Sequence, residues 1–88
     1  MAHCRTVILS RRFEEQALVY IGYIEIDRIV NGMTETVAVH PDRGMQTSNP
    51  SVMAVTCDLR GAVYVVYYVY DDDEAELVGF YRMVAPRV

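Results

Sequence analysis

The segment that most restricts the fold is residues 62–70, which reads Ala-Val-Tyr-Val-Val-Tyr-Tyr-Val-Tyr. β-Branched and aromatic residues favour strands, and every position here is apolar instead of every second one. Both faces of such a strand need cover, which is typical of a strand in the middle of a sheet. The preceding Asp58-Leu59-Arg60-Gly61 predicts a tight turn, and residues 52–57 and 77–84 read as neighbouring strands.

The charge of the chain is concentrated in one place. The formal net charge is −4, every positive residue is arginine, and five of the twelve acidic residues lie within residues 71–76. Without those five carboxylates the charge would be +1. The net charge therefore does not exclude nucleic-acid binding, although domains with that function are usually basic. We expect the acidic run to form an exposed hairpin tip that keeps the edge of the sheet soluble.

The length of the acidic loop sets a register for the last two strands. A loop over residues 71–75 pairs Tyr70 with Glu76 and places Tyr64 opposite Arg82. In this register alternate residues of the two strands share one face. These are Val63, Val65, Tyr67 and Val69 from one strand and Leu77, Gly79, Tyr81 and Met83 from the other. The other face carries Tyr64, Val66, Tyr68 and Tyr70 with Val78, Phe80 and Arg82, and a slip of one residue would exchange the faces.

The N-terminal half begins with a strand and a helix. Residues 6–9 are a short β-branched run, Ser10 is a candidate N-cap, and residues 11–16 are a good helix start. Phe13, Ala17, Tyr20 and Ile21 then follow at helical spacing.

Residues 24–39 fit two structures. Apolar residues at helical spacing predict an amphipathic helix with one buried side (Ile26, Ile29, Val30, Met33, Val37). Asn31-Gly32 is also a strong hairpin signal, and folding there gives coherent cross-strand pairs. Pro41 ends either element in a turn over residues 40–44, and residues 45–51 read as a polar loop.

Composition indicates one packed domain over residues 1–88, because 52% of the residues are hydrophobic. Cys4 and Cys57 are expected to be free, mostly buried thiols, and His3 and His40 lack partners at metal-ligand spacing. We therefore expect neither a metal site nor a cofactor. No apolar run approaches the ~20 residues of a membrane span, so the expected location is the cytoplasm, without membrane contact.

Several motifs together are similar to the RelE/ParE superfamily of toxins from bacterial type II toxin–antitoxin modules. Residues 40–44, His-Pro-Asp-Arg-Gly, resemble the Asn-Pro-x-x-Gly turn that closes the second helix of that family. The family's Gly-Tyr-Arg-Val-Val-Tyr strand, acidic turn and final basic strand are matched in order by residues 61–67, 71–74 and 77–82. Residues 7–14 resemble its entry from strand to helix, so the likeness spans nearly the whole chain.

The resemblance implies a small α+β fold: an N-terminal strand, then two helices packed on one face of an antiparallel sheet. It favours a helix over residues 24–39, whereas a hairpin there would give a mostly-β meander. It also implies a cognate antitoxin as partner. RelE-type members cut mRNA on the ribosome, and ParE-type members poison DNA gyrase.

The resemblance also carries candidate catalytic residues. Arg82 matches the basic residue of the family's last strand, and Arg60 lies in the neighbouring turn, so both are candidates to hold phosphate. Tyr64 stands where the family's strand arginine stands, and Tyr64 and Tyr81 are candidates for acid or base. Either tyrosine needs a pKa far below the usual ~10 for that role. The basic residues of the family's preceding strand have no counterpart in residues 52–56.

Three functions follow as alternatives. The first is ribosome-dependent mRNA cleavage with a depleted basic site. The second is a non-catalytic relative that works by binding protein, as a gyrase poison or an accessory partner. The third is an unrelated, mostly-β interaction module, such as one of phage origin. Tyr64, Tyr68 and Tyr70 would serve the first as a base-stacking platform, or they would cover an apolar surface or homodimer interface.

Overall fold

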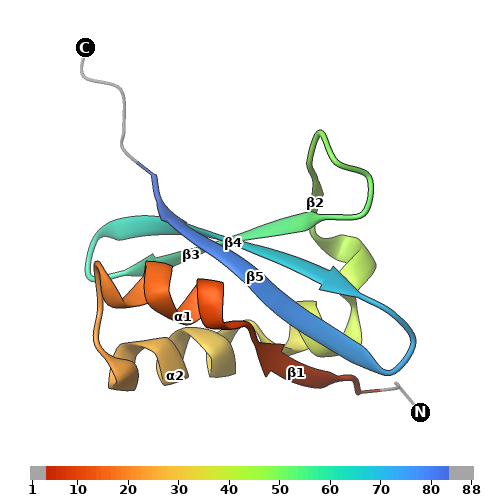
Figure 1. Cartoon of the computed structure of the whole chain (residues 1–88), viewed down its shortest axis with the longest axis horizontal. Helices are drawn as coiled ribbons and strands as arrows, with labels where there is room; N and C mark the ends of the chain where they lie inside the picture. Colours follow the sequence, from red (N-terminus) through yellow and green to blue (C-terminus); the bar gives the residue numbers. More distant parts are fainter. Residues whose placement is uncertain (1–3, 84–88) are drawn as a thin grey trace.

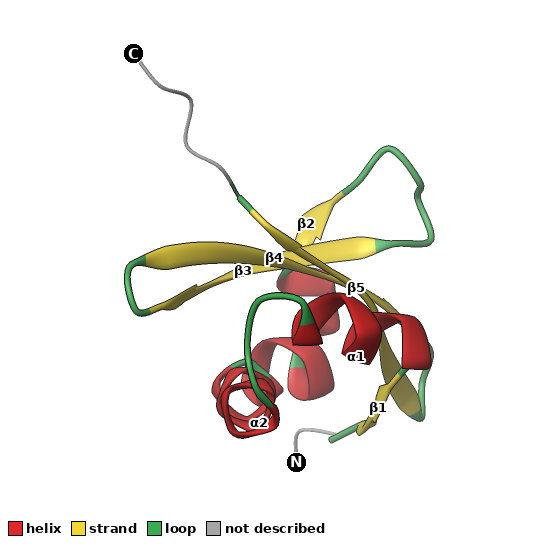
Figure 2. Ribbon diagram, turned by 60° about the vertical axis from the view of Figure 1, so that its left-hand side comes forward, coloured by secondary structure: helices red, strands yellow, loops and turns green. Residues whose placement is uncertain are grey.

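The computed structural model describes residues 4–83 and shows two α-helices lying against one face of a five-stranded sheet (Figures 1 and 2). The α+β class is therefore confirmed. The strand order across the sheet is β1-β5-β4-β3-β2. The strands are β1 (Thr6–Leu9), β2 (Met45–Gln46), β3 (Met53–Leu59), β4 (Ala62–Tyr70) and β5 (Glu74–Arg82), and the α-helices are α1 (Arg11–Leu18) and α2 (Tyr23–Gly32).

The sheet is mixed. Strands β2 to β5 pair as an antiparallel meander, whereas β1 runs parallel to β5, with Leu9 beside Leu77. Strand β4 lies in the middle of the order, as its continuous apolar sequence predicts. Strand β2 is an addition at the start of the segment expected to be a polar loop, where Met45 pairs with Ala54.

Helix α1 begins where the sequence indicates. The Ser10 hydroxyl oxygen accepts a hydrogen bond from the Phe13 amide at 3.1 Å, which caps one of the free amides of the first turn. Phe13, Ala17 and Ile21 are buried against the sheet, whereas Tyr20 is 47% exposed.

Residues 24–39 are helical, and the hairpin is wrong. Helix α2 is followed by a π-helical turn, η1 (Glu35–Val39). The amphipathic pattern prevails because its apolar side finds a sheet to cover: Ile26, Ile29, Met33 and Val37 are all buried. Asn31 and Gly32 lie on the exposed side of the helix, so the hairpin signal carries no weight there. The mostly-β meander is thereby excluded.

The register of β4 and β5 is confirmed at one end and wrong at the other. Tyr64 lies opposite Arg82 as expected, but a bulge at Val78 shifts the pairing, so that Tyr70 lies opposite Ala75. The bulge moves Leu77 onto the side of Tyr68, which faces the helices, and there it is fully buried. The acidic loop is correspondingly shorter than expected, because β5 already begins at Glu74.

The turn at residues 40–44 anchors the helical layer to the sheet. Pro41–Arg43 form a 3-10 turn, η2, and the Pro41 carbonyl accepts a 2.6 Å hydrogen bond from the buried Tyr68 hydroxyl. Gly44 lies directly beneath that hydroxyl, where a Cβ atom would also lie 3.1 Å from the Ala54 carbonyl oxygen.

The two thiols are free, but they are less buried than expected. Cys4 is exposed and Cys57 is partly exposed, so neither belongs to the closed core.

Candidate functional site

The face of β4 that carries Tyr64 and Tyr68 is inside the protein. Tyr64 is 5% exposed and stacks on Phe80 with ring centroids 4.9 Å apart, and Tyr68 is fully buried. These rings form part of the core between the sheet and the helices. A base-stacking platform or a dimer surface at Tyr64 and Tyr68 is therefore wrong, because the helical layer covers both rings. The alternative that they cover an apolar surface is confirmed for these two residues, whereas Tyr70 is 39% exposed.

Tyr81 and Arg82 project from opposite faces of β5. Arg82 pairs with Tyr64 at the helix side, at the exposed end of the strand. Tyr81 lies on the other face, where its ring packs edge-on against Tyr67 at 5.5 Å. Its hydroxyl accepts a 3.1 Å hydrogen bond from Gln16 of α1, which reaches around the edge of the sheet.

Arg60 belongs to the two-residue turn between β3 and β4. Its φ of 53° and the φ of 81° at Gly61 give the left-handed turn that suits the twist of a hairpin. The guanidinium lies 3.6 Å from a carboxylate oxygen of Glu25 in α2, and its side chain is 75% exposed.

The four candidate catalytic residues do not form one cluster. Tyr64 is enclosed in the core, Tyr81 lies on the opposite face, and Arg60 faces a carboxylate of α2. Arg82 is the only arginine in the described strands. Metal-free RNA cleavage needs fixed cations and a tuned acid or base around a single phosphate, and these four positions do not provide that arrangement.

In the part of the chain that the structure describes, both α-helices lie on one side of the sheet, and the other face carries no helix (Figure 2). We call it the open face. It is built from the alternate residues of β4, namely Val63, Val65, Tyr67 and Val69, all partly exposed. Its neighbours across the strands are Ala54, Thr56 and Asp58 of β3 and Gly79, Tyr81 and Glu76 of β5.

A groove of about 610 Å³ crosses the open face. One wall is the loop that follows β2, and the opposite wall is Met83, at the end of β5. None of the lining residues is charged: Met45, Gln46, Thr47, Ser48, Asn49, Val52, Ala54, Thr56, Val65, Tyr67 and Met83. The charged side chains of the strands at this face are carboxylates, Asp58, Glu74 and Glu76.

The groove was not among the residues expected to carry function, although the sequence contains a signal for it. Val63, Val65, Tyr67 and Val69 make the outer face of β4 as apolar as the inner one. That pattern predicts a strand covered on both sides. In the described chain only one side is covered, so the apolar alternation marks a surface that remains accessible.

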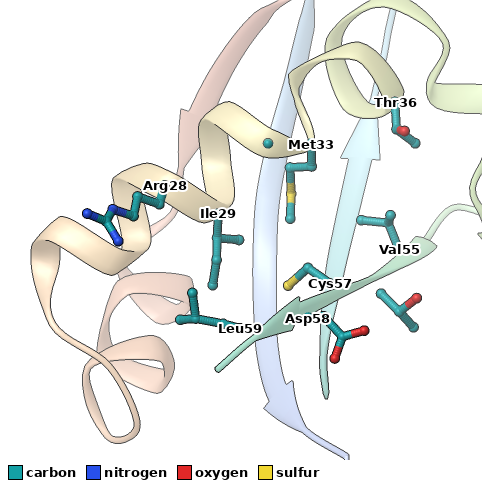
Figure 3. A pocket seen from close by; sticks show the side chains of 10 residues that line it. Arg28, Ile29, Met33, Thr36, Val55, Cys57, Asp58 and Leu59 are labelled. Carbon is teal, nitrogen blue, oxygen red and sulfur yellow. The ribbon is translucent and has the colours of Figure 1, made fainter. Parts of the chain in front are cut away.

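A second, smaller hollow of about 340 Å³ lies between α2 and the outer edge of β3 (Figure 3). Ile29 and Met33 of α2 face Val55, Cys57 and Leu59 of β3 across it, with Arg28 at its mouth. Burial, and to a lesser degree the charge of Asp58, raise the pKa of the Cys57 thiol. The thiol therefore stays protonated near neutral pH and is a poor nucleophile or metal ligand.

Residues 4–83 contain no group of three or more metal-ligating side chains. No helix in the same range is both long and apolar enough to cross a membrane. Comparison of the chain with protein-family models, with curated proteins and with solved structures found no match. The likeness to RelE/ParE toxins thus rests on the sequence motifs.

Proposed function

We propose that the chain is a RelE/ParE-like protein of a cytoplasmic toxin–antitoxin module that acts by binding another protein through its open face, without cleaving RNA. The partner is an antitoxin, or a target such as DNA gyrase. This is the non-catalytic alternative raised by the sequence.

The observation that carries the proposal is the uncharged lining of the open-face groove. An RNA backbone brings one negative charge per nucleotide, and its binding sites place arginine or lysine beside it. The central part of a protein–protein interface is instead depleted in charge and enriched in aromatic residues and methionine. Met45, Tyr67 and Met83 in the groove fit the second description.

The carboxylates beside the groove favour a basic partner. Asp58 and Glu76 lie on the open face, so a second copy of the chain docked there would bring like charges together. A different protein, with apolar residues at its centre and lysine or arginine around them, is complementary to this surface. A homodimer through the open face is therefore disfavoured.

A translation assay tests the absence of catalysis. We expect purified chain, added in excess to a cell-free translation reaction, to leave ribosome-bound mRNA intact, and Arg82→Ala to behave as the wild type does. Specific cuts in ribosome-bound mRNA that disappear in Arg82→Ala would overturn the proposal and restore the ribonuclease alternative.

A matched pair of variants tests the interface. Val65→Asp places a carboxylate in the groove, whereas Ile24→Asp makes the same kind of change at a site that is 74% exposed at the start of α2. When the tagged chain is expressed from its own genomic locus, we expect the co-purifying partner to be lost with Val65→Asp and kept with Ile24→Asp. Equal capture by both variants would place the interface elsewhere. Circular dichroism checks that both variants fold.

A further inference from the structure

The outer edge of β3 is only partly covered. Strand β2 pairs with Met53 and Ala54, and the rest of β3, residues 55–59, has no neighbouring strand on that side in the described chain. An unpaired strand edge is a template for another extended chain.

The register determines which backbone groups point outward. Leu59 and Ala62 flank a two-residue turn and therefore form a hydrogen-bonded pair. Along an antiparallel ladder hydrogen-bonded pairs alternate with non-hydrogen-bonded pairs, and Asp58 and Thr56 belong to the second kind. Their amides and carbonyls therefore point away from β4. Among residues 4–83 no hydrogen bond reaches these four groups.

The hollow beside this edge is shaped for side chains of an added strand. It lies below the edge, between β3 and α2, and its inner surface is formed by Ile29, Met33, Val55, Cys57 and Leu59 (Figure 3). Thr56 lines both this hollow and the open-face groove, so the two surfaces meet at the free edge of β3.

We propose that the free edge of β3 binds an extended segment of a partner protein, which joins the sheet as a sixth strand beside Thr56 and Asp58. The inference rests on the proposed protein-binding function and says how one part of the partner is held. A row of outward amides and carbonyls at strand spacing is complementary to another polypeptide backbone, which supplies both groups in alternation.

The two sides of the edge predict the sequence of the segment. Residues on the side of α2 enter the hollow and should be apolar, at every second position. Residues on the other side lie beside Thr56 and the exposed carboxylate of Asp58, where lysine or arginine is favoured. We therefore expect an alternating apolar and basic segment.

Two pairs of variants test this arrangement. Gly32 lies at the exposed rim of the hollow, and a Cβ atom there meets nothing within 4 Å. The helix therefore accepts Gly32→Phe, which adds a large ring at the rim, while Gly32→Ala leaves the hollow open. Thr56→Pro removes an outward amide without breaking the ladder to β4, whereas Thr56→Val keeps the amide.

The probe is a phage-displayed library of random nine-residue peptides, selected on the wild-type chain. We expect enriched peptides to alternate apolar and basic residues. A synthetic enriched peptide should bind at least about tenfold more weakly to Gly32→Phe and to Thr56→Pro, since each loses about 1.4 kcal/mol or more of contacts, and normally to the two controls. Hydrogen exchange of the Thr56 and Asp58 amides should slow when the peptide binds.

The opposite results overturn the inference. No enrichment, enrichment without alternation, or equal binding to all four variants would each show that the edge takes no strand. The outcome is separable from the proposed function, because the peptide selection tests the edge of β3 and partner capture with Val65→Asp tests the groove. A chain that loses its partner through Val65→Asp but selects no peptide refutes the added strand alone.

Discussion

Because Gly44 has no side chain, the turn at residues 40–44 can pack directly against Tyr68 in the middle of the sheet. The Tyr68 hydroxyl donates to the Pro41 carbonyl, and Gly44 leaves the space in which that hydroxyl lies. The Pro-x-x-Gly spacing of the turn therefore has a structural purpose here, whatever the chain binds. It joins the end of the helical segment to the middle strand of the sheet.

Gly44→Ala should be strongly destabilising. The new Cβ would overlap the Tyr68 hydroxyl and lie 3.0 Å from its ring carbon Cζ, and Tyr68 is fully buried and has no room to move. We expect a loss of about 2–3 kcal/mol in the free energy of unfolding, measured by urea denaturation. The double variant Gly44→Ala/Tyr68→Phe should be less destabilised than the sum of the single variants, because phenylalanine lacks the overlapping oxygen. Strict additivity would mean that the two residues do not interact.

Asp71 should make stability depend on pH. Its carboxylate accepts hydrogen bonds from the amides of Asp73 and Glu74, which lower its pKa from the ordinary 3.8. The stabilisation is therefore present above about pH 4 and is lost as the pH falls through the lowered pKa. We expect Asp71→Asn to unfold at lower urea concentration than the wild type at pH 6, and this difference to be smaller at pH 2. Asp72→Asn is the matched control, and a difference of equal size at both pH values would contradict the explanation.

At the scale of elements, a glycine in helix α2 lowers the stability of the protein. Gly32 is exposed in its last turn and has open space around it. Gly32→Ala should raise the free energy of unfolding by about 1 kcal/mol, because alanine loses less backbone freedom on folding. Thermal and urea denaturation measure the change. A destabilised variant would show that Gly32 has a conformation that alanine does not tolerate.

Gln16 shields from solvent a backbone amide of β5 that lies beyond the residues paired with β1. Its side-chain carbonyl accepts a 2.9 Å hydrogen bond from the Phe80 amide, beyond the last pair of β1 with β5. Gln16→Ala should leave this amide to exchange with solvent and cost about 1 kcal/mol. Hydrogen exchange should accelerate at Phe80, while the amide of Val66, in β4, serves as the internal reference. Unchanged exchange at Phe80 would assign its protection to the strand alone.

The elements differ in how far the sequence predicts them. Residues 6–9 and 62–70 are strands with the expected bounds, because β-branched and aromatic residues form uninterrupted runs there. For residues 24–39 the sequence is ambiguous, because local periodicity and a turn dipeptide compete, and the sheet decides by burying Ile29 and Met33. The bulge at Val78 has no local signal, since it depends on how β5 fits between β4 and β1.

At the scale of the molecule, the candidate site is the part that the sequence predicts least. Its motifs lead to Arg82 and Tyr64, but the helical layer buries Tyr64. The groove on the open face assembles residues from the loop after β2, from β3 and β4, and from the end of β5. Such a surface depends on which face of the sheet the helices cover. An apolar strand has the same sequence whether one face or both are covered.

The parallel pairing of β1 with β5 has a consequence for the way the chain is made. Thr6 lies beside Glu74 and Leu9 beside Leu77, so the first strand of the sheet along the chain pairs with the last one. Contacts between residues so far apart in sequence form slowly, because the chain between them must first be ordered. During synthesis β1 therefore stays unpaired until β5 has emerged. Truncation before β5 would leave the antiparallel strands β2, β3 and β4 but no strand beside which β1 could lie.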